Sequence, residues 1–276
     1  MYAFAVRGDV EDTLERLLSA LDGRAATVRT AAADGATAVD RAVDVGADTE
    51  YVVDDDGWSA EGTGPSIRDA LDRLAPDHDY AAVVGEAPLP TVVVGEPVGE
   101  STTDAHRDEW LPGAAETIYE ARAAAFDPDA AVEAIEGTEP YETLESLVAA
   151  VKRSQRADRS GAIATFTGRV RAKDGADDER TRYLEFEKYD DVAERRMRTI
   201  ESELEKRDGV LDVRLHHRVG RIPDGEDIVF VVVLAGHRRE AFRTVEDGID
   251  RLKDEVPLFK KEVTDSETFW VHERDA

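Results

Sequence analysis

The chain contains no cysteine among its 276 residues. Disulfide bonds, thiolate metal sites and cysteine nucleophiles are therefore excluded. No apolar stretch is long enough to span a bilayer, and the N-terminal sequence MYAFAVRGDVED lacks the basic start of a signal peptide. We expect a cytoplasmic protein with no membrane segment.

Positive charge is also scarce. The chain has 35 basic and 62 acidic residues, a net charge of -27, and the acids are dispersed rather than gathered in a tail. This composition is typical of proteins adapted to concentrated salt, where charge repulsion is screened to within about 3 Å at molar ionic strength. Residues 1–139 carry 9 basic and 31 acidic side chains (net -22), and residues 140–276 carry 26 and 31 (net -5). An anionic small ligand therefore suits the second half, whereas neither half has the basic face that nucleic acid requires.

Lysine is the rarest cation, with seven in the chain and none before Lys152. Three of the seven, Lys253, Lys260 and Lys261, lie within the nine residues KDEVPLFKK. Lysine can act as an anion clamp or in proton transfer, so this cluster is a candidate site. The alternative is that cations near the end of a helix only complement its dipole. Because side chains of extended residues alternate, Lys260 and Lys261 cannot both face Lys253.

The first half alternates apolar strand-like runs with amphipathic helical segments, which predicts an α/β layer domain with a mostly parallel sheet over residues 1–99. We expect strands at 2–6, 51–53, 80–84 and 91–94, and helices at 9–21, 38–45 and 66–74. Residues 100–139 are expected to form a helical connector, with alanine-rich helices over 114–126 and 128–135.

The third predicted domain covers residues 140–276 and again mixes strands with helices. We expect helices at 141–153, 192–206 and 239–255, and strands at 161–170, 182–189, 210–219, 228–235 and 268–272. Pro257 should end the last helix, because the residue before a proline is pushed out of helical geometry.

Two further motifs in this domain could bind an anion. In AGHRR, His237 and Arg238 follow the most apolar strand and open a helix, where free backbone N–H groups favour anions. In FTGRVR, Arg169 and Arg171 lie two residues apart at a strand end and could bracket a phosphate. Helix capping and solvated surface arginines are the respective alternatives. His78, His216 and His217 show no metal-ligand spacing.

The segments FTGRVR, HHRVGRIPDGEDIVFVVVLAGHRREAF, RLKDEVPLFKKE and FWVHER together resemble the catalytic subunit of molybdopterin synthase, from about Tyr141 to Arg274. The resemblance implies an α/β hammerhead fold and a homodimer within a heterotetramer. The partner is a small ubiquitin-like sulfur carrier with a C-terminal Gly-Gly thiocarboxylate. Its sulfur is passed to cyclic pyranopterin monophosphate to form the molybdopterin dithiolene. No metal and no bound cofactor are implied, and the carrier supplies the sulfur that a cysteine-free chain lacks.

The same resemblance assigns roles to individual residues. It makes Lys253 and Lys260 catalytic. The residues that it assigns to substrate binding are Arg169, Val170, Arg171, His237, Arg238, Lys261, Glu262 and Arg274.

Residues 1–98 resemble, more distantly, the GTP-binding adaptor protein of molybdopterin-guanine dinucleotide synthesis. That family carries a phosphate loop of the form GxxxxGK[ST], whereas this chain has RGDVEDTL, with one glycine, no lysine and three acids. We therefore expect a degenerate P-loop-like domain that does not hydrolyse GTP, and that serves in docking or solubility.

Two function classes remain open on the sequence. The first is sulfur transfer in molybdenum cofactor biosynthesis, favoured by Lys253 and Lys260. The second is a non-enzymatic scaffold that binds molybdopterin or the carrier. A third, nucleotide-dependent regulation, needs a phosphate loop that this chain lacks.

Overall fold

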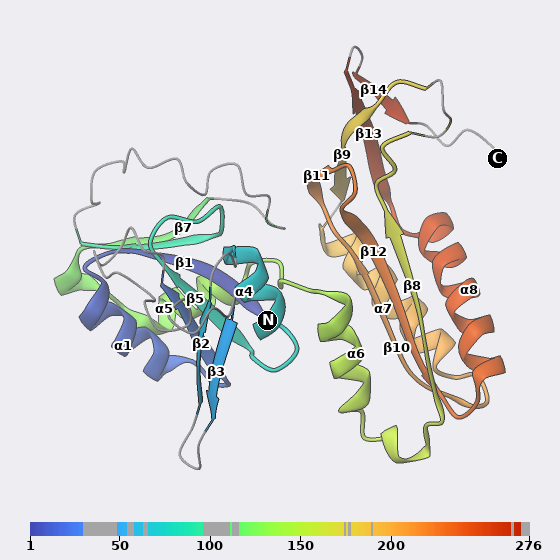
Figure 1. Cartoon of the computed structure of the whole chain (residues 1–276), viewed down its shortest axis with the longest axis horizontal. Coiled ribbons are helices and arrows are strands. Elements are labelled where there is room, and N and C mark those ends of the chain that lie inside the picture. Colours follow the sequence, from blue (N-terminus) through green and yellow to red (C-terminus); the bar gives the residue numbers. More distant parts are fainter. Residues whose placement is uncertain are drawn as a thin grey trace. The chain divides into compact units, whose positions relative to one another are not determined.

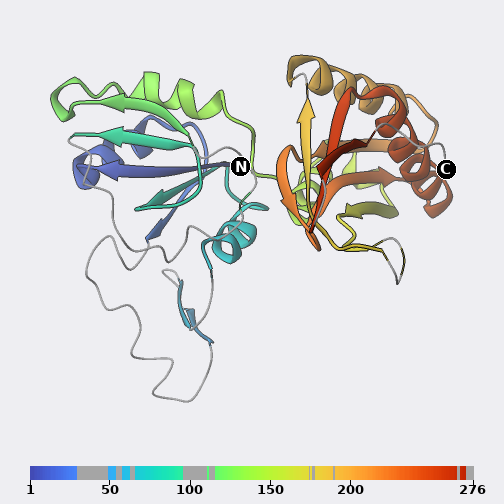
Figure 2. The ribbon, with the colours of Figure 1, turned by 90° about the horizontal axis from the view of Figure 1, so that it is seen from above.

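The computed structural model describes residues 1–29, 49–53, 58–62, 66–95, 111, 116–173, 175, 178–188, 190–265 and 268–271. The chain divides into two compact units, the first reaching Pro140 and the second running from Tyr141 onward. Both are mixed α/β structures (Figures 1 and 2). The helix expected over 38–45 falls outside the described residues.

The first unit is built on a five-stranded parallel sheet with strand order β2-β5-β1-β6-β7. Its strands are β1 (Tyr2–Gly8), β2 (Ala25–Arg29), β5 (Tyr80–Val84), β6 (Thr91–Val94) and β7 (Thr117–Ala121). A separate hairpin consists of β3 (Thr49–Val53) and β4 (Trp58–Gly62). The continuous apolar runs of β5 and β6 are buried along their whole length, as expected for parallel strands covered on both faces.

Helices complete the layers of the first unit. They are α1 (Val10–Ala20), α4 (Ile67–Leu74) and α5 (Pro128–Glu136), with a short 3₁₀ turn at Ala123–Ala125. α1 and α5 pack on each other and on β1, and their apolar side chains meet Phe4, Val6 and Val92 in one core. α4 begins with a capping box, in which Ser66 accepts from the Asp69 N–H and Asp69 accepts from the Ser66 N–H.

The prediction of a helix over residues 114–126 is wrong. Residues 117–121 form β7, which pairs in parallel with β6 at the margin of the sheet. The alanines there favoured a helix, but Thr117, Ile118 and Tyr119 suit a strand, and pairing with β6 decides the outcome. The strand β2 was not predicted, because AATVR is short and partly polar.

The second unit contains two antiparallel sheets. Their strands are β8 (Ala162–Arg169), β9 (Thr181–Lys188), β10 (Val210–His217), β11 (Gly220–Pro223), β12 (Asp227–Ala235), β13 (Leu258–Thr264) and β14 (Thr268–Val271). A three-stranded sheet has the order β10-β12-β8, and a four-stranded sheet has the order β11-β9-β13-β14. The expected α/β fold class and the parallel sheet of the first unit are thus confirmed, and the second unit adds two antiparallel sheets that were not predicted.

Three helices enclose the three-stranded sheet. They are α6 (Leu144–Lys152), α7 (Asp190–Leu204) and α8 (Arg238–Glu255), with a 3₁₀ turn at Ala157–Arg159. α6 packs on one face, against Phe230, Val232 and Leu234, whereas α7 and α8 cover the other. β12 is therefore buried on both faces, which explains the unbroken apolar run DIVFVVVLA.

Side chains accept backbone N–H groups along the β10 edge of the three-stranded sheet. At the β10 edge, Glu201 of α7 accepts the Leu215 N–H at 2.7 Å, and Glu205, directly after the helix, accepts the Val213 N–H at 3.1 Å. These two carboxylates thus satisfy donors that an edge strand would otherwise expose. Burial among apolar side chains raises the pKa of Glu201 to about 7.

Candidate functional site

The Arg169–Arg171 segment lies where β8 ends. The Val170 side chain is 2% exposed, and its N–H donates to the Glu226 carbonyl. Arg169 forms an ion pair with Asp227 at 3.2 Å and donates to the Gly225 carbonyl, so its guanidinium is held beside the start of β12. Arg171 is exposed and lies just beyond the strand. Buried Val170 thus anchors a pair of exposed guanidiniums.

His237 and Arg238 lie at the start of α8, as predicted. His237 is the N-cap residue, but its side chain forms no capping hydrogen bond, and both side chains are exposed. The preceding Gly236 N–H donates to the Gly209 carbonyl at 2.8 Å, which fixes the turn between β12 and α8. Two exposed basic side chains thus flank backbone N–H groups of the first helical turn, an arrangement suited to an anion.

Lys253 lies in the last turn of the same helix and is exposed. The helix ends at Glu255, and Val256 adopts an extended conformation (φ -89°, ψ 123°) directly before Pro257. The predicted effect of the proline is therefore confirmed.

The two remaining lysines, Lys260 and Lys261, are neighbours on strand β13. Lys260 pairs with Phe186 of β9 and Lys261 with Glu185, so the two side chains occupy opposite faces of the four-stranded sheet. The Lys261 ammonium donates to the Glu185 carboxylate at 3.0 Å, and this hydrogen bond raises the pKa of Lys261. Lys260 shares its face with Phe186, which is buried and packs edge-on against His217. Lys261 thus has a carboxylate partner, and Lys260 lies on the sheet face that packs inward.

Glu262 follows on the Lys260 face and accepts a hydrogen bond from the hydroxyl of buried Thr181. Arg274 lies outside the described residues. His217 is buried, with its Nδ1 2.7 Å from the Arg218 carbonyl oxygen, which favours a structural role for this histidine.

The length of α8 separates two groups of the predicted residues. His237 and Lys253 are sixteen residues apart on one helix, which corresponds to about 24 Å at 1.5 Å per residue. β8 runs antiparallel to β12, and Arg169 pairs with Asp227 at the start of β12, whereas α8 begins beyond its other end. Arg169 therefore lies toward the Lys253 end, far from His237 and Arg238. One copy of the chain cannot gather all these side chains around a small ligand.

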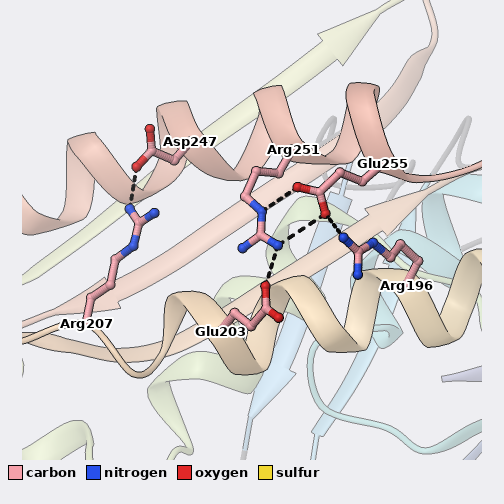
Figure 3. A network of polar contacts seen from close by, with 6 residues as sticks. All are labelled: Arg196, Glu203, Arg207, Asp247, Arg251 and Glu255. Carbon is pink, nitrogen blue, oxygen red and sulfur yellow. Dashed lines mark hydrogen bonds and ion pairs between the residues drawn. The ribbon is translucent and has the colours of Figure 1, made fainter.

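An arginine–carboxylate network holds the C-terminal half of α8 against α7 (Figure 3). Arg251 donates to Glu255 on its own helix, at 2.8 and 3.1 Å, and to Glu203 on α7. Arg196 of α7 also donates to Glu255. Hydrogen bonds from Arg251 lower the pKa of Glu255 and of Glu203. The network fixes the helix turn that carries Lys253.

Three residues that orient the candidate site were not found from the sequence: Glu185, Asp227 and Phe186. Their roles depend on cross-strand register, which single-sequence patterns do not reveal. In the described part of the chain, no three His, Cys, Asp or Glu side chains come together as a metal site would require. Among the same residues, no helix has the length and apolar character needed to cross a membrane.

Known proteins resemble both the second unit and the whole chain. The family model described as MoaE protein matches residues 138–255. A probable molybdopterin synthase from Haloferax volcanii is 48% identical over 279 residues, covering 99% of this chain and 100% of that protein. The chain belongs to the molybdopterin synthase family. Its expected function in molybdenum cofactor biosynthesis, as a molybdopterin synthase, is thereby confirmed.

Other members of the molybdopterin synthase family match less than half of the chain. The catalytic subunit from Pyrococcus abyssi is 37% identical over 128 residues, covering 46% of this chain and 82% of that protein. A solved molybdopterin synthase from Staphylococcus aureus is 32% identical, with a TM-score of 0.40 over 42% of this chain and 83% of that one. The expected likeness of residues 1–98 to a GTP-binding adaptor stays a prediction.

Proposed function

We propose that the second unit moves sulfur from the thiocarboxylated Gly-Gly terminus of a small ubiquitin-like carrier to cyclic pyranopterin monophosphate, in a fold of the hammerhead type. Both reactants are anions. The second unit carries 26 of the chain's 35 basic residues and all seven lysines, so it is the half suited to receive them. Two rounds of transfer give the dithiolene.

We assign different roles to Lys260 and Lys261 because their side chains lie on opposite faces of β13. Glu185 neutralises Lys261, whereas Lys260 occupies the opposite face. Lys253, held in place by the α7–α8 network, is exposed at the adjoining end of α8. We assign Lys253 and Lys260 to holding the thiocarboxylate and supplying the proton as sulfur bonds to the pterin side chain. Arg169, Arg171, His237, Arg238 and Arg274 bind the substrate anion, with Val170, Lys261 and Glu262 supporting them.

The decisive experiment mixes the full chain with thiocarboxylated carrier and pyranopterin and measures dithiolene. Lys253→Ala and Lys260→Ala should each abolish product while carrier binding persists. Lys261→Ala should have the smaller effect, because Glu185 already compensates that charge. Lys206→Ala, an exposed lysine after α7, is the matched control. Near wild-type turnover by Lys253→Ala or Lys260→Ala would remove the role given to that residue.

A non-enzymatic scaffold is the second candidate. It predicts that the carrier binds, yet no dithiolene forms with the wild-type chain under conditions in which a relative's catalytic subunit produces it. Such a result would favour the scaffold over the enzyme.

For the first unit we propose a degenerate P-loop-like domain that does not bind nucleotide. β1 ends at Gly8 and α1 begins at Val10, so a single residue, Asp9, joins them. The Asp9 N–H donates to the Val94 carbonyl at 2.7 Å instead of facing a ligand, and Glu11 and Asp12 add negative charge to the first turn. A phosphate loop needs several free N–H groups. Micromolar GTP binding in a titration would contradict this proposal.

We further propose that the enzyme works in the cytoplasm as a homodimer with two carriers. The separation of His237 and Arg238 from Lys253 along α8 supports this arrangement, because a second copy can supply the group that one copy lacks.

A further inference from the structure

One face of the four-stranded sheet carries two opposite charges close together. Lys260 and Glu262 are two residues apart on β13, and their cross-strand partners on β9, Phe186 and Leu184, are both buried. Ile222 of β11 pairs with Leu184 and is also buried. An ammonium and a carboxylate on a largely apolar surface attract strongly, because the local dielectric constant is low. Electrostatics alone therefore favours an ion pair between Lys260 and Glu262.

Glu262 is bound to a different residue, Thr181. The Thr181 hydroxyl donates to the Glu262 carboxylate. Among the residues that the structure describes, Lys260 has no ion pair, although its neighbour Lys261 has a carboxylate partner, Glu185, at 3.0 Å on the other face. Thr181 thus occupies the carboxylate that shares a face with Lys260.

A bulge in β9 places Thr181 on this face. Tyr183 pairs with Val263 and Thr181 pairs with Thr264, so Arg182 is an extra residue on β9. The extra residue reverses the alternation of side chains, which turns Thr181 inward (5% exposed) and leaves Arg182 exposed. In a regular strand, Thr181 would face outward with Tyr183, out of reach of the inner face.

Thr181 also contacts the arginine segment at the end of β8. Its N–H donates to the carbonyl of Ala172 at 2.9 Å, and Ala172 directly follows Arg171. The backbone of Thr181 thus holds the residue next to a proposed substrate-binding arginine, while its side chain holds Glu262. Both contacts place Thr181 beside candidate site residues that come from different strands.

We propose that Thr181 is a positioning residue for sulfur transfer: by binding Glu262, it keeps the Lys260 ammonium available to an incoming anion. The inference rests on the proposed function for the identity of that anion, the thiocarboxylate of the carrier. Without the hydroxyl, Glu262 turns to Lys260 and competes with the thiocarboxylate for the same ammonium. Thr181 therefore acts on the reaction through Glu262.

Turnover by the full chain gives the first test. Thr181→Val removes the hydroxyl but keeps the branched shape of the side chain, and it should slow dithiolene formation about two- to fivefold, the range of a partly exposed ion pair. Thr181→Ser keeps the hydroxyl and should stay close to the wild-type rate. Equal losses in the two variants overturn the proposal.

Thr264→Val is the matched control for loss of a hydroxyl from the same sheet. The Thr264 hydroxyl donates to Glu179 at 2.9 Å, and neither residue belongs to the candidate site. This variant should therefore keep the wild-type rate. A loss as large as that of Thr181→Val would mean that any hydroxyl removed from this sheet slows the reaction, and would overturn the specific role of Thr181.

Acetylation of Lys260 reports its ion pairing without the sulfur-transfer reaction. Acetic anhydride reacts with a neutral amine, and an ammonium in an ion pair releases its proton less readily. In Thr181→Val, the acetylation rate of Lys260 relative to exposed Lys206, followed by mass spectrometry, should fall about two- to fivefold. Adding Glu262→Gln removes the competing charge and should restore the wild-type ratio. An unchanged ratio in Thr181→Val, or a ratio that stays low in the double variant, overturns the proposal.

The two measurements separate this inference from the proposed function. A role of Thr181 in folding alone would lower the free energy of unfolding but would leave the acetylation ratio unchanged. If the ratio follows the expected pattern while the wild-type chain forms no dithiolene, the result supports the role of Thr181 and counts against the proposed function.

Discussion

Gly8 occupies a backbone position that other residues cannot take without strain. Its φ is +99°, and an added Cβ would lie 2.0 Å from the Val94 carbonyl oxygen. Gly8→Ala should therefore destabilise the first unit by more than the roughly 1–3 kcal/mol of backbone strain alone, measured by urea unfolding.

Gly220→Ala is the matched control for this substitution. Gly220 also has a positive φ (+79°), but an added Cβ would meet nothing within 4 Å. Its cost should be limited to strain, about 1 kcal/mol. Equal costs for both variants would show that the contact with Val94 relaxes freely.

Glu201 gives the second unit a pH-dependent stability. Burial raises its pKa to about 7, with Glu205 and Asp212 adding to the rise and Arg214 and the Leu215 N–H opposing it. Between about pH 4.5 and 7 the folded state binds more protons than the unfolded state, so this group's contribution to stability falls as pH rises. Glu201→Gln keeps an acceptor for Leu215 and should stabilise the protein at pH 8 by at most about 3 kcal/mol, with the gain vanishing near pH 4.

The measurement compares urea unfolding of wild type and Glu201→Gln from pH 4 to 8. Glu246→Gln, an exposed position on α8, is the control and should show no such pH trend. A constant difference between wild type and Glu201→Gln across the range would mean that Glu201 titrates near its ordinary value.

At the scale of elements, the contact between α7 and α8 depends on Arg251. This side chain joins Glu203 on one helix to Glu255 on the other (Figure 3). Arg251→Gln should lower the free energy of unfolding by about 1 kcal/mol, because the pairs are partly exposed, and the loss should shrink in 2 M KCl. Urea unfolding at both salt concentrations checks this, with exposed Arg195→Gln on α7 as control. An equal loss in 2 M salt would indicate packing rather than charge.

The elements with strong periodicity were predictable. The helix expected over 239–255 differs from α8 by one residue, because its apolar spacing and Pro257 both mark its extent. Residues 114–126 were mispredicted because pairing with β6 outweighed the helical preference of alanine. In the site, the alternation of Lys260 and Lys261 followed from strand geometry alone. The pairing of Lys261 with Glu185, 76 residues away, needs the register of β9 and β13, which no local pattern contains.

At the scale of the whole molecule, negative charge is concentrated before residue 140. Net charges of -22 and -5 mean that self-repulsion opposes folding more strongly in the first unit than in the second. Raising salt from 0.1 to 2 M shortens the screening length from about 10 Å to 2–3 Å. Hydrogen exchange of the full chain should therefore slow more in residues 1–95 than in residues 141–265. Equal slowing in both parts would exclude charge repulsion as the cause.

The carboxylates of Glu201 and Glu205, which accept N–H groups of β10, limit how strands of other chains can add to the three-stranded sheet. If both margins of the three-stranded sheet could recruit a neighbour, addition would continue without limit and produce fibres. Glu201 and Glu205 already accept the outward N–H groups of Leu215 and Val213, so these donors are not available to a strand of another chain at the β10 edge. Continuous strand addition through both edges of this sheet is therefore blocked at β10.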